Sequence, residues 1–217
     1  MTKAVLFDMD GVLAFTEPYY NRRRVAYLSD NGFEVPGDSD WTGVHDDESW
    51  ERCVPDDVEL RERLRAGYDA FADANPTPWA ELGNRHAHAT FVALRDRGVR
   101  TAICSSSPRH LIGECMDALD LRGLTGYFIS GDECVAHKPD PEIYLRAMRC
   151  LGVRPEESIV VEDSPTGIRA GKAAGALVCA LRQPDGVLLD QREADLVIDD
   201  LFELVELVGA QKTPLLS

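Results

Sequence analysis

Short apolar runs recur along the chain and predict the strands of a buried sheet. The first run, residues 4–7, has no helical spacing, and such a run is typical of a strand that is covered on both faces in a parallel sheet. Further runs of this kind lie at residues 101–104, 127–130, 158–162, 176–181 and 195–198. Each is predicted to be a strand.

Apolar residues at helical spacing alternate with these runs from residue 81 onward. Ala87, Phe91 and Leu94 would line one face of a helix that ends at Gly98. A further apolar face is formed by Leu111, Ile112, Cys115, Met116 and Leu119. An alternation of strands and helices predicts an α/β fold with a doubly wound, Rossmann-like parallel sheet and right-handed crossovers.

Capping residues mark where several of these helices should begin. Ser107 is a favoured N-cap and Pro108 a favoured first residue, so a helix is expected to start there. Asp140 is expected to cap a helix that runs to Gly152. A short helix after residue 162 contains Gly167, Gly171 and Gly175, and the tail after Val208 is expected to fray.

The alternation is interrupted between residues 15 and 81, where the pattern is mostly helical and polar. Pro18, Val25, Leu28 and Gly32 fit one helix, and residues 41–48 fit a loop followed by a helix start. A second apolar helix face is formed by Leu60, Leu64, Tyr68 and Phe71. Prolines at residues 76 and 78 end this segment. We predict a catalytic core at 1–14 and 82–217 with an inserted helical domain at 15–81.

Composition and charge narrow the class of partner. The chain has 217 residues with 44% hydrophobic content, and 23 Lys and Arg against 38 Asp and Glu leave a net charge of −15. This charge argues against nucleic acid and anionic membranes as partners. No apolar run approaches the ~20 residues of a membrane span, and no signal-peptide pattern is present, so a cytoplasmic protein is expected. Six scattered cysteines without a Cys-x-x-Cys pair predict buried free thiols.

Two carboxylates directly follow the first strand. Asp8 and Asp10 point the same way if the strand geometry continues, and Gly11 allows the chain to turn off the sheet edge. Ligands of open α/β sheets bind at the carboxyl ends of the strands. Two acids held close together repel each other, and a divalent cation relieves that repulsion. Alone, such a pair also occurs in turns and helix caps.

The other predicted strand ends bring polar groups to the same edge of the sheet. These groups are Ser105, Ser106, Lys138, Glu162 and Asp163. Oxygen ligands from Asp8, Asp163 and a backbone carbonyl suit Mg²⁺, which shares a substrate phosphate. Lys138 supplies a positive charge, and Ser105 with neighbouring N–H groups supplies donors for an anion. The sequence therefore predicts a site for a dianion and its metal.

Each of these residues also has a purely structural explanation. Asp163 could be a helix N-cap, Glu162 could sit on a solvated edge, and Lys138 could be a surface lysine. The serines at residues 105–107 could form only a turn and a cap, which is the interpretation favoured for Ser107. Four strand ends in one order favour the functional interpretation for the remaining residues.

The order of motifs resembles a known family. Residues Asp8-Met9-Asp10-Gly11-Val12, then Ser105, Lys138-Pro139 and Glu162-Asp163-Ser164 resemble the motifs of the haloacid dehalogenase-like hydrolases. The resemblance is to the branch of phosphatases and phosphohexomutases that carry a helical cap after the first strand. It implies a cap that closes over the site, a small phosphate ester as substrate and Mg²⁺ as cofactor.

The resemblance also implies a role for each motif residue. Asp8 would be the nucleophile that becomes an aspartyl-phosphate, and Asp10 the acid and base. Asp8, the backbone carbonyl of Asp10, and Asp163 would bind the metal, with Glu162 either a ligand or a holder of a metal-bound water. Ser105 and Lys138 would hold the phosphoryl group, and the backbone N–H groups of Met9 and Ser106 would assist.

Departures from the family pattern concern substrate choice. Phe15 replaces a usual acid, and Tyr20 and Asp46 stand where phosphohexomutases carry a histidine and an arginine, which argues against a mutase. Residues 84–88 lack the usual Pro-Gly. The candidates for substrate contact are Trp41, His45, Asp46, Tyr20, Arg85 and His86. The run of arginines at residues 22–24 is expected to be mostly a solvated face, with one arginine able to reach an anionic substrate.

A magnesium-dependent phosphatase acting on a small phosphomonoester, as a monomer or weak dimer, is therefore predicted. Three alternatives stay open. The first is a phosphohexomutase such as a β-phosphoglucomutase, which would move a phosphoryl group between sugar positions. The second is a catalytically silent binding protein on the same fold, although binding alone does not require both Asp8 and Asp10. The third is an aspartate-nucleophile dehalogenase, against which the second aspartate and the acid pair argue.

Overall fold

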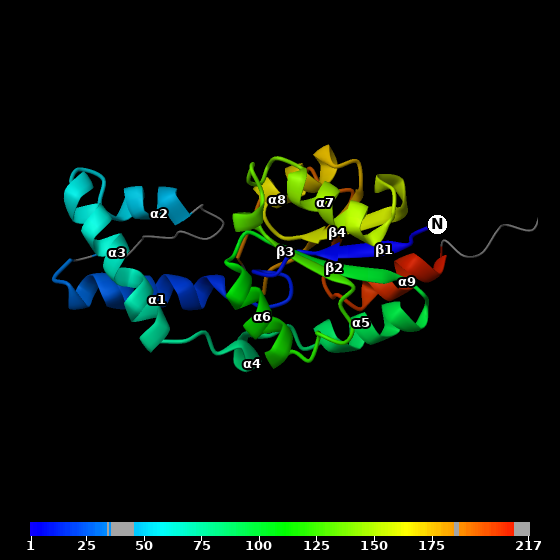
Figure 1. Cartoon of the computed structure of the whole chain (residues 1–217), viewed down its shortest axis with the longest axis horizontal. Coiled ribbons are helices and arrows are strands. Elements are labelled where there is room, and N and C mark those ends of the chain that lie inside the picture. The colour runs from blue at the N-terminus through cyan, green and yellow to red at the C-terminus, as the bar shows by residue number, and fades with distance from the viewer. Residues whose placement is uncertain (34, 36–45, 185–186, 211–217) are drawn as a thin grey trace, which may run out of the picture. The chain divides into compact units, whose positions relative to one another are not determined.

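The computed structural model, drawn in Figure 1, describes residues 1–33, 35, 46–184 and 187–210. The chain divides into two compact units. The core unit consists of Met1–Phe15 and Trp79–Ser217, and the helical unit consists of Thr16–Pro78. The sequence analysis placed these boundaries after residues 14 and 81.

The core unit is built on one parallel sheet in the strand order β3-β2-β1-β4-β5-β6. The strands are β1 (Ala4–Phe7), β2 (Arg100–Ser105), β3 (Tyr127–Ser130), β4 (Ser158–Glu162), β5 (Leu177–Leu181) and β6 (Leu196–Ile198). All four residues of β1 are buried, as the unbroken apolar run predicts. The predicted α/β class and doubly wound parallel sheet are confirmed.

Helices cover both faces of this sheet (Figure 1). Val5 and Phe7 pack with α5 (Ala87–Asp96), α6 (Arg109–Ala118) and α9 (Glu203–Ala210). Ala4 and Leu6 face the other way and pack with α7 (Glu142–Leu151) and α8 (Pro165–Ala173). Because side chains alternate along β1, its residues belong to two separate hydrophobic clusters, one on each face of the sheet. The short elements α4 (Trp79–Leu82), η1 (Gly131–Glu133) and η2 (Pro155–Glu157) complete the core.

Two predicted helix starts are wrong by one residue. Pro108 is the N-cap of α6, with Arg109 as the first helical residue, and Ser107 lies outside the helix. Pro141 is the N-cap of α7, although the Asp140 carboxylate accepts the backbone N–H of Glu142 at 2.9 Å. In each case a proline has no N–H to give, so it can begin a helix without leaving a donor unpaired.

Two helices were not predicted. The four-residue α4 is too short to give a periodic pattern. The helix α9 runs to residue 210, two residues beyond Val208, where the tail was expected to fray, and residues 211–217 of that tail lie outside the described residues. Leu201, Leu204 and Val208 of this region are buried against the sheet, so tertiary packing stabilises a helix that the terminal position argued against.

The helical unit consists of α1 (Glu17–Asp30), α2 (Asp46–Cys53) and α3 (Val58–Ala74). Its core gathers Tyr27, Leu28, Trp50, Cys53, Val54 and Leu64. The predicted apolar faces of α1 and α3 are only partly correct, because Val25 is 39% exposed while Leu28 and Leu64 are buried. Trp41, Gly43 and His45 lie outside the described residues.

The expectation of a mostly solvated arginine face is wrong for Arg24 and only partly correct for Arg23, which is half-buried. Arg24 is 8% exposed, and its guanidinium lies 5.5 Å from the Trp50 ring centre. Arg23 donates to the Tyr68 hydroxyl at 3.1 Å and to the Asn75 carbonyl at 3.0 Å. Aromatic faces and carbonyl groups accept these cations inside the unit. Arg22 is exposed.

All six cysteines are free thiols. Cys53, Cys104, Cys115 and Cys179 are buried as expected, whereas Cys134 is half-buried and Cys150 is exposed. Among the described residues, no helix combines the length and apolarity that crossing a membrane requires.

Candidate active site

The register of the sheet brings the acids together. Phe7 of β1 pairs with Ile103 of β2 and with Val161 of β4, so the next residues of the three strands meet at one edge. Asp8 continues the β1 ladder through its N–H, which donates to the Val161 carbonyl at 2.9 Å. The nucleophile candidate therefore lies between the ends of β2 and β4, where parallel sheets bind ligands.

Lys138 reaches this edge from the connection between β3 and α7. Its Nζ lies 2.6 Å from Asp8 Oδ1 and 2.6 Å from Glu162 Oε1, and it donates to the Cys104 carbonyl at 3.1 Å. The side chain is 7% exposed. The alternative of a surface lysine is therefore wrong. A buried ammonium shared by two carboxylates offsets part of their negative charge.

Glu162 is the most enclosed of the acids. Its Oε1 also accepts the Tyr144 hydroxyl at 2.6 Å, while Oε2 accepts the Ser164 hydroxyl at 3.2 Å and the Asp163 N–H at 3.1 Å. Space for the carboxylate exists because residue 167 is glycine, where a Cβ would lie 1.8 Å from Oε1. The alternative of a solvated edge position is wrong, because Glu162 is fully buried.

Asp163 lies beside the turn that follows Asp10. Gly11 has a φ of +81°, and a Cβ there would lie 2.0 Å from Asp163 Oδ2. Glycine is thus required both by the backbone angle and by this close approach. The N-cap of α8 is Ser164, which accepts the Gly167 N–H at 3.1 Å, so the alternative of Asp163 as the cap is wrong.

Three carboxylates form a group that suits a divalent cation. Asp8, Glu162 and Asp163 each offer an oxygen, and these atoms lie within 4.8 Å of one another. All three residues are buried. Hard oxygen donors of this kind match Mg²⁺, and the single ammonium of Lys138 does not balance three negative charges. The donor set therefore fits the divalent metal that the sequence predicts.

Asp10 is oriented by two serines from the end of β2. Ser107 Oγ donates to Asp10 Oδ2 at 2.6 Å, and Ser105 Oγ lies 3.4 Å from the same oxygen. Ser105 Oγ in turn accepts the Ser107 N–H at 3.0 Å, and Ser130 Oγ donates to the Ser107 carbonyl at 2.7 Å. This network holds the carboxylate of Asp10 outside the three-carboxylate group.

Burial and charge change the proton affinities at the site. Burial raises the pKa of Asp8 well above its ordinary value, although Lys138 opposes the rise. Burial disfavours the charged form of Lys138, but the charges of Asp8 and Glu162 outweigh it and raise the pKa of the ammonium. Burial and the Glu162 charge raise the pKa of Tyr144. Lys138 and Tyr144 therefore remain protonated and act as donors at neutral pH.

The other predicted core residues occupy the surrounding loops. Met9 is buried, and its carbonyl accepts the N–H groups of Val12, Leu13 and Ala14 to close the turn after β1. Ser106 is exposed next to Ser105. Substrate contact through the N–H groups of Met9 and Ser106 stays a prediction, as does metal binding through the Asp10 carbonyl.

The candidates for substrate contact are more scattered. His86 lies in the core unit at the N-cap of α5, and its Nδ1 pairs with Asp200, which lies just before α9. Arg85 is exposed beside it. Tyr20 lies on α1 and Asp46 begins α2, both in the helical unit. Trp41 and His45 lie outside the described residues.

Four residues of the site were not predicted. Ser107 was assigned to a helix cap, although the run of three serines was a signal for more than one hydroxyl at this strand end. Tyr144 was hidden within the apolar face of α7. Gln183 and Gln191 donate to the carbonyls of Gly11 and Asp163 from the connection after β5, and no sequence spacing links them to the acids.

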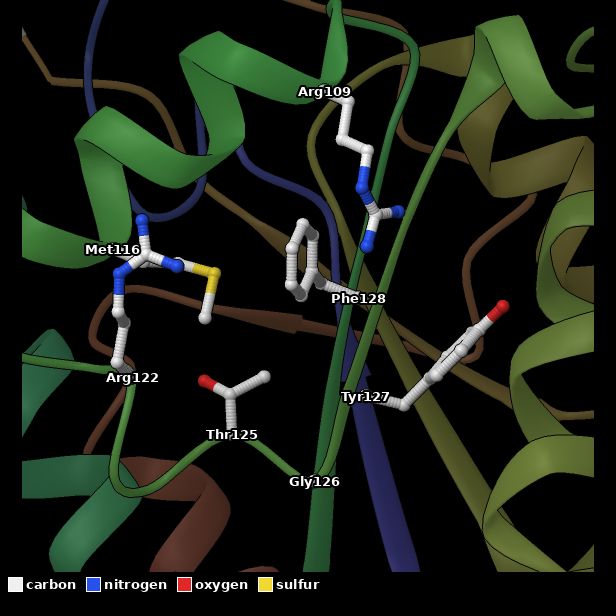
Figure 2. A pocket seen from close by; sticks show the side chains of 7 residues that line it. All are labelled: Arg109, Met116, Arg122, Thr125, Gly126, Tyr127 and Phe128. Carbon is white, nitrogen blue, oxygen red and sulfur yellow. The ribbon is translucent and has the colours of Figure 1, made fainter.

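A separate cavity lies beside the edge strand β3, between α6 and residues 122–128. It has a volume of about 310 Å³, is lined from α6 by both Arg109 at the start of the helix and Met116 near its end, and contains none of the predicted site residues (Figure 2). Its two cations are already paired, Arg109 with Glu133 at 2.6 Å and Arg122 with Asp117. The candidate active site is therefore the carboxyl edge of the sheet and not this cavity.

Comparison with known proteins gives the family of the chain. A family model described as haloacid dehalogenase-like hydrolase matches residues 2–175. A phosphorylated carbohydrates phosphatase of Thermotoga maritima is 31% identical over 183 residues, covering 80% of this chain and 82% of that protein. A validoxylamine A 7'-phosphate phosphatase of Streptomyces hygroscopicus subsp. limoneus is 31% identical over 210 residues, covering 94% and 96%.

Solved structures share the fold. A β-phosphoglucomutase from Clostridium difficile superimposes with a TM-score of 0.76 at 19% identity, covering 97% of each chain. CbbY from Rhodobacter sphaeroides, solved in complex with phosphate, gives a TM-score of 0.72 at 22% identity, covering 94% of this chain and 96% of that one. At these identities the likeness concerns the architecture alone.

Proposed function

Because the chain belongs to the haloacid dehalogenase-like hydrolases, we propose that it is a magnesium-dependent phosphatase that cleaves a small phosphomonoester through an aspartyl-phosphate. The enzyme class, a phosphatase-type hydrolase, follows from the family and from its phosphatase relatives. We propose in addition that the metal is magnesium, that the intermediate is an aspartyl-phosphate and that the substrate is small.

One observation carries the proposal. The carboxylate of Asp8 lies at the end of β1 with the ammonium of Lys138 at 2.6 Å and two further buried acids within 4.8 Å. A carboxylate nucleophile needs a cationic surrounding when it attacks a dianionic phosphate, because the two would otherwise repel each other. Lys138 supplies one positive charge next to Asp8. The three carboxylates of Asp8, Glu162 and Asp163 supply ligands for a cation, which would bring further positive charge.

In the first half of the reaction, an oxygen of Asp8 attacks phosphorus and the bond from phosphorus to the leaving oxygen breaks. Asp10 gives its proton to that oxygen, so that the product leaves as an alcohol. Lys138 and the Ser105 hydroxyl stabilise the charge on the phosphoryl oxygens during transfer. Ser107 keeps the Asp10 carboxyl oriented through its hydrogen bond to Oδ2.

In the second half, water attacks the phosphorus of the aspartyl-phosphate. The carboxylate of Asp10 accepts the proton of that water, and the bond between phosphorus and Asp8 breaks. Phosphate leaves, and both aspartates return to their starting states. Asp10 therefore alternates between acid and base, which requires a carboxyl group that can be reached by both the alcohol and the water.

Asp8, Asp163 and Glu162 would hold the magnesium ion, together with the backbone carbonyl of Asp10. When bound, the ion supplies positive charge to the phosphate oxygens and to the acids themselves. The fit rests on the oxygen donors of the three buried carboxylates and on their uncompensated charge.

The test is phosphate release from a panel of sugar phosphates, nucleotides, glycolytic acids and p-nitrophenyl phosphate, with and without magnesium. The wild type and Asp8→Asn are compared, with Asp96→Asn as a matched control, because Asp96 is an exposed carboxylate that pairs with Arg95. We expect a magnesium-dependent activity that Asp8→Asn abolishes and Asp96→Asn retains.

Two outcomes would contradict the proposal. Equal activity of the wild type and Asp8→Asn would remove Asp8 from the role of nucleophile. Isomerisation of glucose 1-phosphate without net phosphate release would show a phosphohexomutase in place of a phosphatase. The folded state of Asp8→Asn is checked by thermal melting, since asparagine keeps the size of the side chain while losing its charge.

A further inference from the structure

Two glutamine side chains on the connection between β5 and β6 contact the loops that carry the acids. The Nε2 amide of Gln191 donates to the Asp163 carbonyl at 3.0 Å and to the Leu181 carbonyl at 2.8 Å. The Nε2 amide of Gln183 donates to the Gly11 carbonyl at 2.7 Å and lies 3.5 Å from the same Leu181 carbonyl. Both amides thus contact the same carbonyl, that of Leu181 at the end of β5.

These contacts lie where the sheet ladders end. The last pair between β4 and β5 is Glu162 with Ala180, and the last pair between β1 and β4 is Phe7 with Val161. Beyond these pairs, one further hydrogen bond joins β1 and β4, from the Asp8 N–H to the Val161 carbonyl, and the carbonyls that follow need other donors. A primary amide carries two N–H groups, so one glutamine can bridge two carbonyls. Gln191 in this way extends the pairing of β4 and β5 to Asp163 and Leu181.

The two amides also lie on either side of one close contact, between Gly11 and the carboxylate of Asp163. Gly11 and the carboxylate of Asp163 lie so near that a Cβ on Gly11 would be 2.0 Å from Oδ2. Gln183 holds the carbonyl on the Gly11 side, and Gln191 holds the carbonyl on the Asp163 side. A shift of either loop would therefore move the Asp163 carboxylate relative to Asp8 and Glu162, with which it shares the three-carboxylate group.

We propose that Gln191 and Gln183 are positioning residues of the metal site, which hold the Asp163 and Gly11 loops and thereby orient the Asp163 carboxylate for a divalent cation. This inference rests on the proposed magnesium-dependent function. Groups that orient metal ligands without touching the metal affect its affinity strongly, because the ligand is otherwise free to turn away. Gln191 has the larger effect on metal affinity, since it contacts the backbone of the ligand residue Asp163 itself.

The test is isothermal titration of the metal-free 217-residue protein with magnesium chloride, without substrate. Gln191→Met keeps the length of the side chain and removes both donors, and Gln183→Met does the same for the Gly11 loop. Arg192→Met is the matched control on the same connection, because Arg192 is 88% exposed and pairs with Asp190. We expect the Kd for magnesium to rise about 10-fold in Gln191→Met, and less in Gln183→Met, with an unchanged Kd in the control.

The binding stoichiometry separates positioning from folding. A positioning residue raises the Kd while each molecule still binds the same number of ions, and activity returns at saturating magnesium. A merely structural residue lowers the bound fraction and leaves the Kd unchanged, and that result would overturn the inference. Gln183→Met keeps the test decisive if Gln191→Met does not fold.

The outcome for the wild type distinguishes the two proposals. If the wild type releases phosphate and binds magnesium but both glutamine variants keep its Kd, the positioning role alone is wrong. If the wild type neither binds magnesium nor releases phosphate from any ester, the proposed function fails and the positioning role fails with it.

Discussion

The hydroxyl of Ser107 donates a short hydrogen bond to Asp10 Oδ2, at 2.6 Å. We predict that Ser107→Ala lowers kcat/KM about 10-fold for a sugar phosphate, because a charge-assisted hydrogen bond then no longer orients the acid. The loss should be smaller for p-nitrophenyl phosphate, whose leaving group departs without a proton. Steady-state kinetics on both substrates measures the ratio.

Ser158→Ala is the control for this variant. Ser158 is also buried, but its hydroxyl donates to the Arg154 carbonyl at the opposite end of β4. It should leave both activities unchanged. An equal loss on both substrates in Ser107→Ala would show that Ser107 acts on phosphate binding or folding and not on the acid.

Single residues also explain why Glu162 tolerates full burial. The free-energy cost of removing the carboxylate from water is offset by hydrogen bonds. Its two oxygens accept them from the side chains of Lys138, Tyr144 and Ser164 and from the Asp163 N–H. Residue 167 must be glycine to leave room for that carboxylate. Residues 162–167 therefore contribute both to the close packing around Glu162 and to the acids of the candidate site.

At the scale of elements, Glu157 connects the starts of β1 and β4. Its carboxylate accepts Arg154 Nη2 at 3.1 Å and Lys3 Nζ at 2.7 Å. These partners hold the pKa of Glu157 at about 2, below its ordinary value of 4.5. The charged form is favoured by folding, so its contribution to stability is present above pH 4.5 and is lost as the pH falls toward 2.

We therefore predict that Glu157→Gln lowers Tm at neutral pH and that the difference from the wild type shrinks below pH 4.5. Thermal melts across this range measure the difference. Glu156→Gln is the control, because the neighbouring carboxylate is 63% exposed and pairs with Arg154 at 3.2 Å. A difference in Tm that stays constant with pH would contradict the ionic origin.

At the scale of the whole molecule, a bound cation should stabilise the fold. We predict that magnesium at ten times its Kd raises the free energy of unfolding by about 1.4 kcal/mol. For a chain of this size that corresponds to a rise in Tm of roughly 3 to 6 °C. Asp163→Asn should lose most of the rise, because it removes one of the three carboxylates.

Differential scanning calorimetry with and without magnesium checks this prediction, with Asp96→Asn again as the control for a lost surface charge. Asp163→Asn should be no less stable than the wild type without metal, since the like charges of Asp8 and Glu162 then lose a neighbour. An equal rise in Tm for wild type and Asp163→Asn would place the cation elsewhere.

Much of the molecule follows from local patterns. Strands of a parallel sheet are short apolar runs in the sequence, and this property places the six strands within a few residues, including β6, where Leu196 and Val197 are exposed. The parallel topology then implies that Asp8, Ser105 and Glu162 end at one edge. The sequence thus determines the α/β class, the interruption by a helical unit and the acids and lysine of the site, because strand geometry and chain order are sufficient to bring those residues together.

Only the tertiary structure decides how that site is held. The Tyr144 hydroxyl, the Gln183 and Gln191 amides and the Ser107 hydroxyl each act across distances that no local periodicity records. The burial of Arg24 and the pairing of His86 with Asp200 likewise depend on which helices pack together. A side chain's partners are set by the three-dimensional packing of distant elements, whereas its membership of a strand or helix is set by its neighbours in the chain.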